Sequence, residues 1–183
     1  MEKPDSFWDY ASLFEKYKKD CTIFFETGTH QGDSVADALY LGYEKIISVE
    51  VAQVYYDMCV DKFKNNTNVH LFLGDSNVRM PEMLTLVDQK ALFWLDGHWL
   101  EGHENTGEPI WKELEFLESH PIKNHTIIID DIDPLFPGRE IDLKTAILKI
   151  NHEYKFVMEP QVKSFKSNQG AGILNGHLVA YIE

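Results

Sequence analysis

Acidic residues stand at the end of five short apolar runs in this 183-residue chain. Such runs are typical of strands that are buried on both faces of a sheet. If the strands are parallel, their carboxyl ends meet at one edge, which is where open α/β sheets bind ligands. Because scattered surface carboxylates would not recur so regularly, we expect a functional site at this edge. The acids are Glu26, Glu50, Asp75, Asp96, Asp130 and Asp131.

The first run is followed by a turn with two glycines, Gly28 and Gly32. Glycine lets the backbone approach a ligand closely, although a plain tight turn is an equal alternative. The Gly-x-x-x-Gly spacing differs from the Gly-x-Gly-x-x-Gly fingerprint of dinucleotide sites, so pyrophosphate binding is disfavoured. Glu50 ends the second run, 24 residues after Glu26. An acid in that place can bind ribose hydroxyls, and a solvated strand end is the alternative.

The elements that must position these residues alternate between strand and helix. We expect strands at 21–26, 45–50, 68–75, 91–96, 125–131, 154–159 and 176–183, and helices at 5–19, 36–42, 53–66, 78–87, 110–119 and 142–152. This alternation predicts an α/β protein with a doubly wound, Rossmann-like, seven-stranded and mostly parallel sheet. The linker at 160–175 carries no crossover helix, so the last strand should be antiparallel.

Length and composition favour one domain, with a lead-in helix in residues 1–20 and a single domain over 21–183.

Seventeen basic and thirty acidic residues give a net charge of −13, which disfavours nucleic acid and anionic membranes as partners. No apolar run approaches a membrane span, and the first residues lack the apolar stretch of a signal peptide. Cys21 and Cys59 are predicted to be buried thiols in a reducing compartment. We therefore expect a cytoplasmic protein.

The first predicted helix has an aromatic face made by Phe7, Tyr10, Phe14 and Tyr17. These residues recur at intervals of three and four, which places them on one side of a helix. This face could pack on the chain's own core, close the site as a lid, or pair with a second copy in a homo-oligomer. Packing on the core is the default expectation.

The chain resembles the class I S-adenosylmethionine-dependent methyltransferases over nearly its whole length. Glu26-x-Gly28 is similar to the first motif of that superfamily. Glu50 is similar to its ribose-binding acid, and Asp75-Ser76 to its adenine-side motif. The resemblance implies the Rossmann-like fold and S-adenosylmethionine as cofactor. The residues that we expect to bind the cofactor are Glu26, Thr27, Gly28, Thr29, His30, Gly32, Ser34, Glu50, Asp75, Ser76 and Asp96.

The glycine turn and the later acids are also similar to the metal-dependent O-methyltransferases of the macrocin and novobiocin sugar type. In that family, an acid after the fourth strand and an Asp-Asp pair after the fifth hold a divalent cation. A base two residues after the first of these acids takes the substrate proton. The resemblance implies Asp96, Asp130 and Asp131 as metal ligands, with Mg²⁺ as the metal, and His98 as the catalytic base. The chain departs from the pattern because the family has an acid at the position of His98, and because the chain is shorter.

These residue types suit metal-assisted methylation of a hydroxyl group. A bound Mg²⁺ favours the alkoxide by charge stabilisation, and its preferred ligands are carboxylate and water oxygens. A histidine, with a reference pKa near ~6.5, can accept the proton. Structural roles remain as alternatives, since Asp130 and Asp131 could cap a helix or form a solvated turn, and His98 could be a polar loop residue.

Three functions are compatible with these patterns. The favoured one is methylation of a small-molecule acceptor, a sugar or similar hydroxyl compound. Methylation of a nucleic-acid base is disfavoured, because that chemistry commonly shows an Asp/Asn-Pro-Pro-Tyr/Phe run after the fourth strand, where this chain has Asp96-Gly-His98-Trp99. The second is a metal-dependent hydrolase or phosphoesterase that uses Asp96-x-His98. The third is a non-catalytic nucleoside-binding domain, which the acidic edge argues against because crowded carboxylates repel one another.

Overall fold

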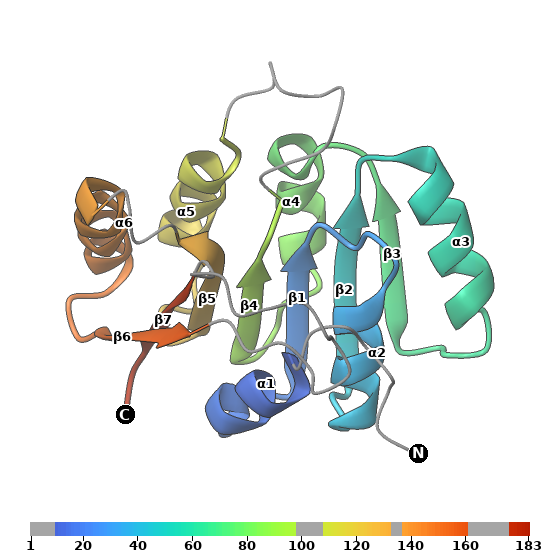
Figure 1. Cartoon of the computed structure of the whole chain (residues 1–183), viewed down its shortest axis with the longest axis horizontal. Helices are drawn as coiled ribbons and strands as arrows, with labels where there is room; N and C mark the ends of the chain where they lie inside the picture. The colour runs from blue at the N-terminus through green and yellow to red at the C-terminus, as the bar shows by residue number, and fades with distance from the viewer. Residues whose placement is uncertain (1–9, 98–107, 133–136, 161–175) are drawn as a thin grey trace, which may run out of the picture.

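The computed structural model describes residues 10–97, 108–132, 137–160 and 176–183. Strands and helices alternate along the chain until the last two strands (Figure 1). The strands are β1 (Ile23–Thr27), β2 (Lys45–Glu50), β3 (Val69–Leu73), β4 (Ala91–Leu95), β5 (Thr126–Ile132), β6 (Lys155–Pro160) and β7 (Gly176–Tyr181). The helices are α1 (Tyr10–Lys18), α2 (Asp33–Tyr40), α3 (Gln53–Phe63), α4 (Ser76–Leu84), α5 (Ile110–Ser119) and α6 (Pro137–Ile150).

The strands form one seven-stranded sheet in the order β3-β2-β1-β4-β5-β7-β6. The central pairs β1–β2, β1–β4, β2–β3 and β4–β5 are parallel. Strand β7 runs antiparallel to both of its neighbours, β5 and β6. This arrangement confirms the predicted fold class, including the antiparallel last strand. Every residue of β1 and β4 is buried, as expected for central parallel strands that are covered on both faces.

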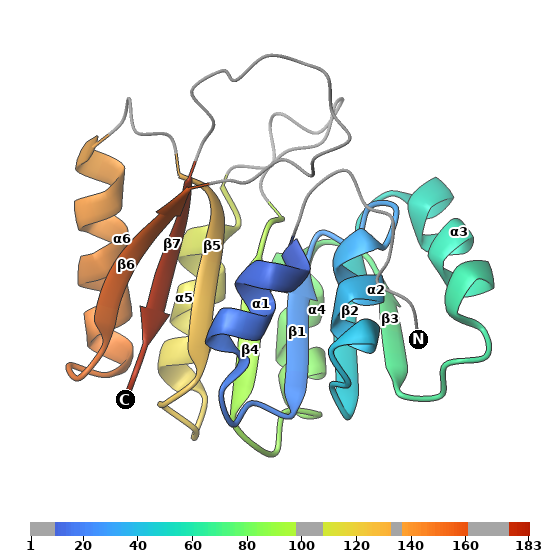
Figure 2. The same ribbon diagram turned by 60° about the horizontal axis from the view of Figure 1, so that its bottom comes forward.

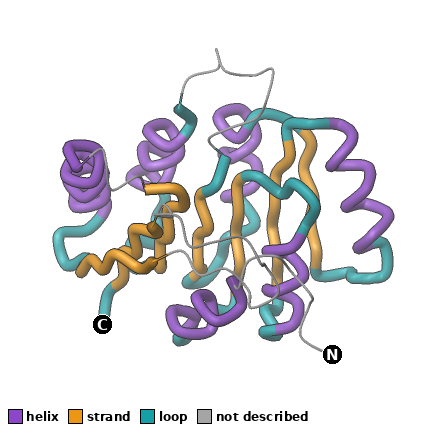
Figure 3. Tube along the Cα trace, in the orientation of Figure 1, coloured by secondary structure: helices purple, strands orange, loops and turns teal. Residues whose placement is uncertain are grey.

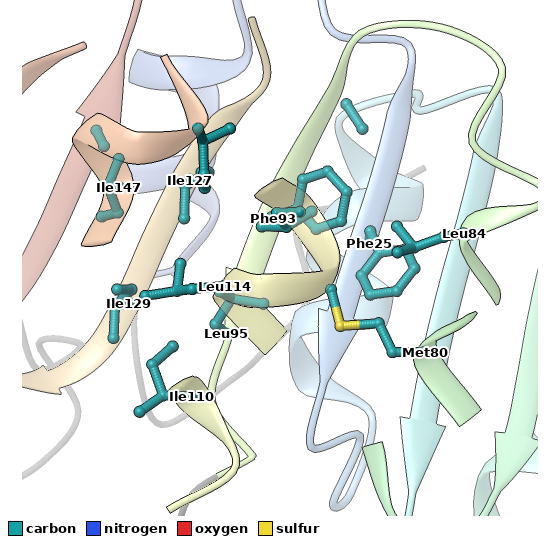
Figure 4. Close-up of a cluster of buried hydrophobic side chains, with 14 of the residues drawn as sticks. Phe25, Met80, Leu84, Phe93, Leu95, Ile110, Leu114, Ile127, Ile129 and Ile147 are labelled. Atoms are coloured by element: carbon teal, nitrogen blue, oxygen red, sulfur yellow. The ribbon is translucent and has the colours of Figure 1, made fainter. Parts of the chain in front are cut away.

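Helices cover both faces of the sheet (Figure 2). On one face, Phe14 of α1 packs in a buried cluster with Phe24 of β1 and Trp94 of β4, together with side chains from α2 and α3. On the other face, α4, α5 and α6 contribute side chains to a second buried cluster, which also contains Phe25 and Phe93 (Figure 4). The adjacent residues Phe24 and Phe25 serve different faces because side chains alternate along a strand.

Three helices begin earlier than the apolar periodicity predicts, since α2, α4 and α6 were expected from residues 36, 78 and 142. Periodicity detects the buried face of a helix, whereas its first turn is placed by local capping. Gly32 precedes α2 in the left-handed conformation, with φ of 73°. The carboxylate of Asp75 caps α4 by accepting a hydrogen bond from the Asn77 backbone N–H at 2.8 Å. Both caps lie at the edge of the sheet that carries the predicted site.

The described residues of the predicted aromatic face pack on the chain's own core, as the default expectation had it, whereas Phe7 lies outside the described residues. Phe14 is fully buried and Tyr17 nearly so. Cys21 and Cys59 are both buried and free, which confirms the prediction of two buried thiols. Within the described part of the chain, none of the helices has the length and apolar character that crossing a membrane would require.

Candidate functional site

The carboxyl ends of β1, β2, β3 and β4 lie along one edge of the sheet, and the connections from β1, β2 and β3 to the helices that follow them leave from this edge (Figures 1 and 3). The parallel register places Glu26 of β1 beside Ser48 of β2 and Trp94 of β4. Glu50, the last residue of β2, pairs with Leu73 of β3. The sheet therefore brings the predicted acids to a common edge, although each has a different environment.

The two glycines of the turn after β1 are required by close contacts inside the protein. Gly28 has φ of 92°, and a Cβ atom there would lie 2.5 Å from the carbonyl oxygen of Asp96. A Cβ atom on Gly32 would lie 2.6 Å from the ring of Phe63. The backbone N–H groups of Gly28 and Thr29 both donate to the carbonyl of Val49. The missing side chains thus let the turn pack against the residue that follows β4 and against α3, a structural role that the sequence left open beside close approach to a ligand.

Glu26, which was predicted to bind the cofactor at this edge, is fully buried. Its carboxyl group accepts hydrogen bonds from the hydroxyls of Ser34 in α2 and Ser48 in β2, the latter at 2.6 Å. The hydroxyl of Thr29 contacts that of Ser48 in the same network. Burial raises the pKa of Glu26 from 4.5 to about 8, because a charged carboxylate is poorly solvated there. Glu26 therefore connects the end of β1 to α2 and β2 as a mostly neutral acid at pH 7.

Glu50 holds the glycine turn in place through its two carboxylate oxygens. Oε2 accepts the backbone N–H of His30 at 2.7 Å, and Oε1 accepts that of Ala52 at 2.8 Å. His30 has a φ of 46°, and its ring lies 4.4 Å from the ring of Tyr55. A carboxylate oxygen has two lone pairs, so each oxygen of Glu50 can accept a further hydrogen bond from a hydroxyl group.

Two buried polar atoms at the edge have no hydrogen-bond partner among the described residues. They are the hydroxyl oxygen of Thr27, at the end of β1, and the side-chain carbonyl oxygen of Asn77, in the first turn of α4. An unsatisfied buried polar atom costs about 1–3 kcal/mol, so a ligand that bonds to both would gain affinity. Asn77 follows the predicted pair of Asp75, the α4 cap, and the buried Ser76. The sequence analysis predicted Asp75 and Ser76 as binding residues but did not include Asn77, the next residue.

Asp96, Asp130 and Asp131 lie close enough for their charges to interact. Burial raises the pKa of Asp96 well above its usual range, and the neighbouring carboxylates of Asp130 and Asp131 raise it further. Asp131 has a φ of 53°, an uncommon conformation for a residue other than glycine. The three acids predicted as metal ligands are therefore brought together.

One of these acids, Asp130, is nevertheless engaged within the protein. Oδ1 of Asp130 accepts the Asp131 backbone N–H at 2.7 Å and lies 2.6 Å from Nδ1 of His177 in β7. In the described part of the chain, no three His, Cys, Asp or Glu side chains are arranged so that they could hold a metal ion. These residues therefore do not support the predicted Mg²⁺ site. His98, the predicted base, lies outside the described residues.

Sequence reasoning missed two buried polar residues at this edge. Glu113 of α5 is 1% exposed and adds to the rise in the pKa of Asp96. Its position between Ile110 and Leu114 on the apolar face of the predicted helix could have identified it. His177, 3% exposed, is placed by the pairing of β7 with β5, which nothing in its own sequence neighbourhood indicates.

Comparison with known proteins supports this fold without identifying a family. No protein-family profile and no curated protein sequence matches the chain. Solved structures do match, among them the O-methyltransferase of Bacillus cereus in complex with S-adenosylhomocysteine. It has a TM-score of 0.60 and 12% identity, and the match covers 100% of this chain and 84% of that one.

Two further solved structures with the same fold have different names, one a methyltransferase and one a synthase. A Streptococcus mutans protein assigned as a methyltransferase, also in complex with S-adenosylhomocysteine, has a TM-score of 0.61 and 13% identity over 93% of this chain and 96% of its own. The spermidine synthase of Thermotoga maritima has a TM-score of 0.56 and 12% identity over 87% of this chain and 53% of its own. The chain therefore has the Rossmann-like fold of methyltransferases. At such low identity the fold does not decide the reaction.

Proposed function

We propose that this protein is an S-adenosylmethionine-dependent methyltransferase whose acceptor is a hydroxyl group on a small molecule. The observation that carries the proposal is Glu50 at the end of β2, bound to the glycine turn after β1. In open α/β sheets, an acid in this place binds ribose hydroxyls. The likeness to structures that contain S-adenosylhomocysteine favours this cofactor over the substrates of a metal-dependent hydrolase.

The residues at the edge fit the polar groups of this cofactor. Glu50 has lone pairs left for the two ribose hydroxyls after it binds the backbone of His30 and Ala52. The unpartnered oxygen of Asn77 can accept a hydrogen bond from the amino group of an adenine. The unpartnered hydroxyl of Thr27, at the end of β1, can bind a polar group of the methionine part. When bound, the cofactor supplies an electrophilic methyl group.

Our proposal assigns no metal to the reaction. The Asp130 oxygen that faces His177 also accepts the Asp131 backbone N–H, so this oxygen is used within the fold. The net charge of −13 supports a small-molecule acceptor rather than nucleic acid or an anionic membrane. A cytoplasmic location and a possible homo-oligomer remain predictions from the sequence.

Calorimetric titration of S-adenosylmethionine and S-adenosylhomocysteine into the protein tests the proposal. We expect saturable binding, and we expect Glu50→Gln to weaken it at least tenfold, because one carboxylate oxygen is replaced by an NH₂ group. Glu118→Gln, on the exposed end of α5, is the matched control and should bind like the wild type. Each variant is checked by circular dichroism, so that lost binding is not mistaken for lost structure.

The outcomes separate the three hypotheses. No binding of either nucleoside to the folded protein would refute the methyltransferase proposal, and phosphoesterase assays with divalent metals would follow. Titrations with Mg²⁺ and with chelator show whether a metal contributes. Binding without methyl transfer to any hydroxyl compound in a broad acceptor panel would favour a non-catalytic nucleoside-binding domain.

A further inference from the structure

The glycine turn between β1 and α2 has a backbone conformation that its own residues do not favour. Positive φ angles occur at Gly28 with 92°, His30 with 46° and Gly32 with 73°. Such angles are unfavourable for a residue that carries a Cβ atom, which includes His30. Contacts from outside the turn must therefore help to hold this shape. Strand β2 supplies some of them, through the carbonyl of Val49 and the carboxylate of Glu50.

Helix α3 supplies further contacts to the turn from one of its faces. Tyr55, Cys59 and Lys62 follow one another at intervals of four and three residues, which places them on the same side of the helix. The ring of Tyr55 lies 4.4 Å from that of His30, and Sγ of Cys59 donates to the carbonyl oxygen of His30 at 3.3 Å. Figure 2 shows α3 next to α2, the helix that begins where the turn ends.

Lys62 binds the turn through its ammonium group. Nζ donates to the carbonyl oxygen of Gln31 at 2.8 Å and to that of Gly32 at 3.3 Å. Hydrogen bonds from a charged donor are stronger than those between neutral groups. Nζ also lies 3.6 Å from Oδ1 of Asp33, the first residue of α2. The charge of Lys62 acts on the end of β1 as well, since it lowers the pKa of Glu26 against the larger effect of burial.

We propose that Lys62 is a positioning residue of the cofactor site, and that it acts by holding the glycine turn in the shape that meets Glu50. The inference rests on the proposed function, because the turn and Glu50 form the expected cofactor site. A turn that is already held loses less conformational freedom when a ligand binds, which raises the affinity. Without the ammonium group, the turn would leave Glu50 in a fraction of the molecules, and the apparent affinity would fall by that fraction.

Calorimetric titration of S-adenosylhomocysteine into the Lys62→Met variant tests the proposal. Methionine keeps most of the aliphatic chain and removes the ammonium group. Because the Lys62 side chain is 38% exposed, the change opens no cavity in the core. We expect binding at least fivefold weaker than that of the wild type. Lys62→Arg, which can donate to both carbonyls, should stay within twofold of the wild type. Lys64→Met is the matched control, since Lys64 follows α3 and pairs only with the exposed Asp61.

Amide hydrogen exchange, followed by nuclear magnetic resonance in the free protein, separates positioning from a general loss of stability. In Lys62→Met, the His30 N–H that Glu50 accepts should exchange at least threefold faster, whereas the amides of the central strand β4 should keep their wild-type rates. Wild-type affinity in Lys62→Met, or an unchanged rate at His30, would overturn the proposal. Failure of the wild type to bind S-adenosylhomocysteine would instead refute the proposed function, and the exchange rate at His30 would still decide whether Lys62 holds the turn.

Discussion

Replacing Glu26 by Gln should remove a pH dependence that burial of this acid imposes on the stability of the protein. The carboxyl group lies between the hydroxyls of Ser34 and Ser48 with no exposed surface. Glutamine has nearly the same shape. The hydroxyl that faces its NH₂ group can accept a hydrogen bond from it, and the hydroxyl that faces its carbonyl oxygen can donate one, because Ser34 and Ser48 bond to different oxygens of Glu26. The substitution therefore keeps the packing and removes the ionisable proton.

The size of the effect follows from the raised pKa of Glu26, which burial moves from 4.5 to about 8. Between these pH values, the folded state keeps the proton while the unfolded state loses it, so stability falls as the pH rises. Each pH unit costs about 1.4 kcal/mol. Between pH 5.5 and 7.5, the wild type should lose about 3 kcal/mol through this group, and Glu26→Gln should lose none of it.

Urea unfolding followed by circular dichroism, at half-unit steps from pH 5 to 8, measures this difference. The quantity of interest is the free energy of unfolding of Glu26→Gln minus that of the wild type. We expect it to increase with pH by about 1.4 kcal/mol per unit. A constant difference across this range, whatever its size, would show that Glu26 is ionised in the folded protein and that the reasoning from burial is wrong.

Three further predictions concern stability. Burial and the nearby His120 lower the pKa of His125 from 6.5 to about 3. The free energy of unfolding should therefore fall by about 1.4 kcal/mol per pH unit as the pH drops below 6.5, because only the unfolded state takes up the proton. In urea unfolding, His125→Asn should lose less stability than the wild type between pH 6.5 and 5. Gly28→Ala should cost about 3 kcal/mol, because a positive φ and a contact with the Asp96 backbone oppose the new Cβ atom. Gly42→Ala is its control, because Gly42 has φ of 70° but open space around the Cβ position. This control should cost about 1 kcal/mol. Equal losses of stability for the two variants in thermal unfolding would contradict the role of the contact with Asp96. Phe14→Ala should cost about 4 kcal/mol if α1 belongs to the core, and a loss below 1 kcal/mol in urea unfolding would show that it does not.

The sequence was sufficient for the fold because each strand and helix carries its own periodicity. Strand β2 at 45–50 and helix α5 at 110–119 were predicted with the observed bounds. The antiparallel last strand followed from the missing crossover helix. The first turns of α2 and α6 were missed, since caps such as Gly32 are placed by backbone conformation rather than by an apolar pattern.

The edge that gathers the acids was also predictable, because parallel strands must end on the same side of a sheet. The partners of each acid were not predictable. Glu26 and Glu50 both follow apolar runs, yet one is sealed between two hydroxyls and the other holds the glycine turn. The difference arises from α2, whose Ser34 covers Glu26, and no local pattern reports that contact.

The contact between Asp130 and His177 depends on the order of the strands in the sheet. The sequence alone determined an acid pair after the fifth strand and a histidine near the start of the last. Only the tertiary structure placed Asp130 against His177, because β7 inserts antiparallel between β5 and β6 and brings together residues 47 positions apart. Pairing between distant strands depends on the free energy of the whole sheet, which is why such contacts cannot be deduced from the residues beside them.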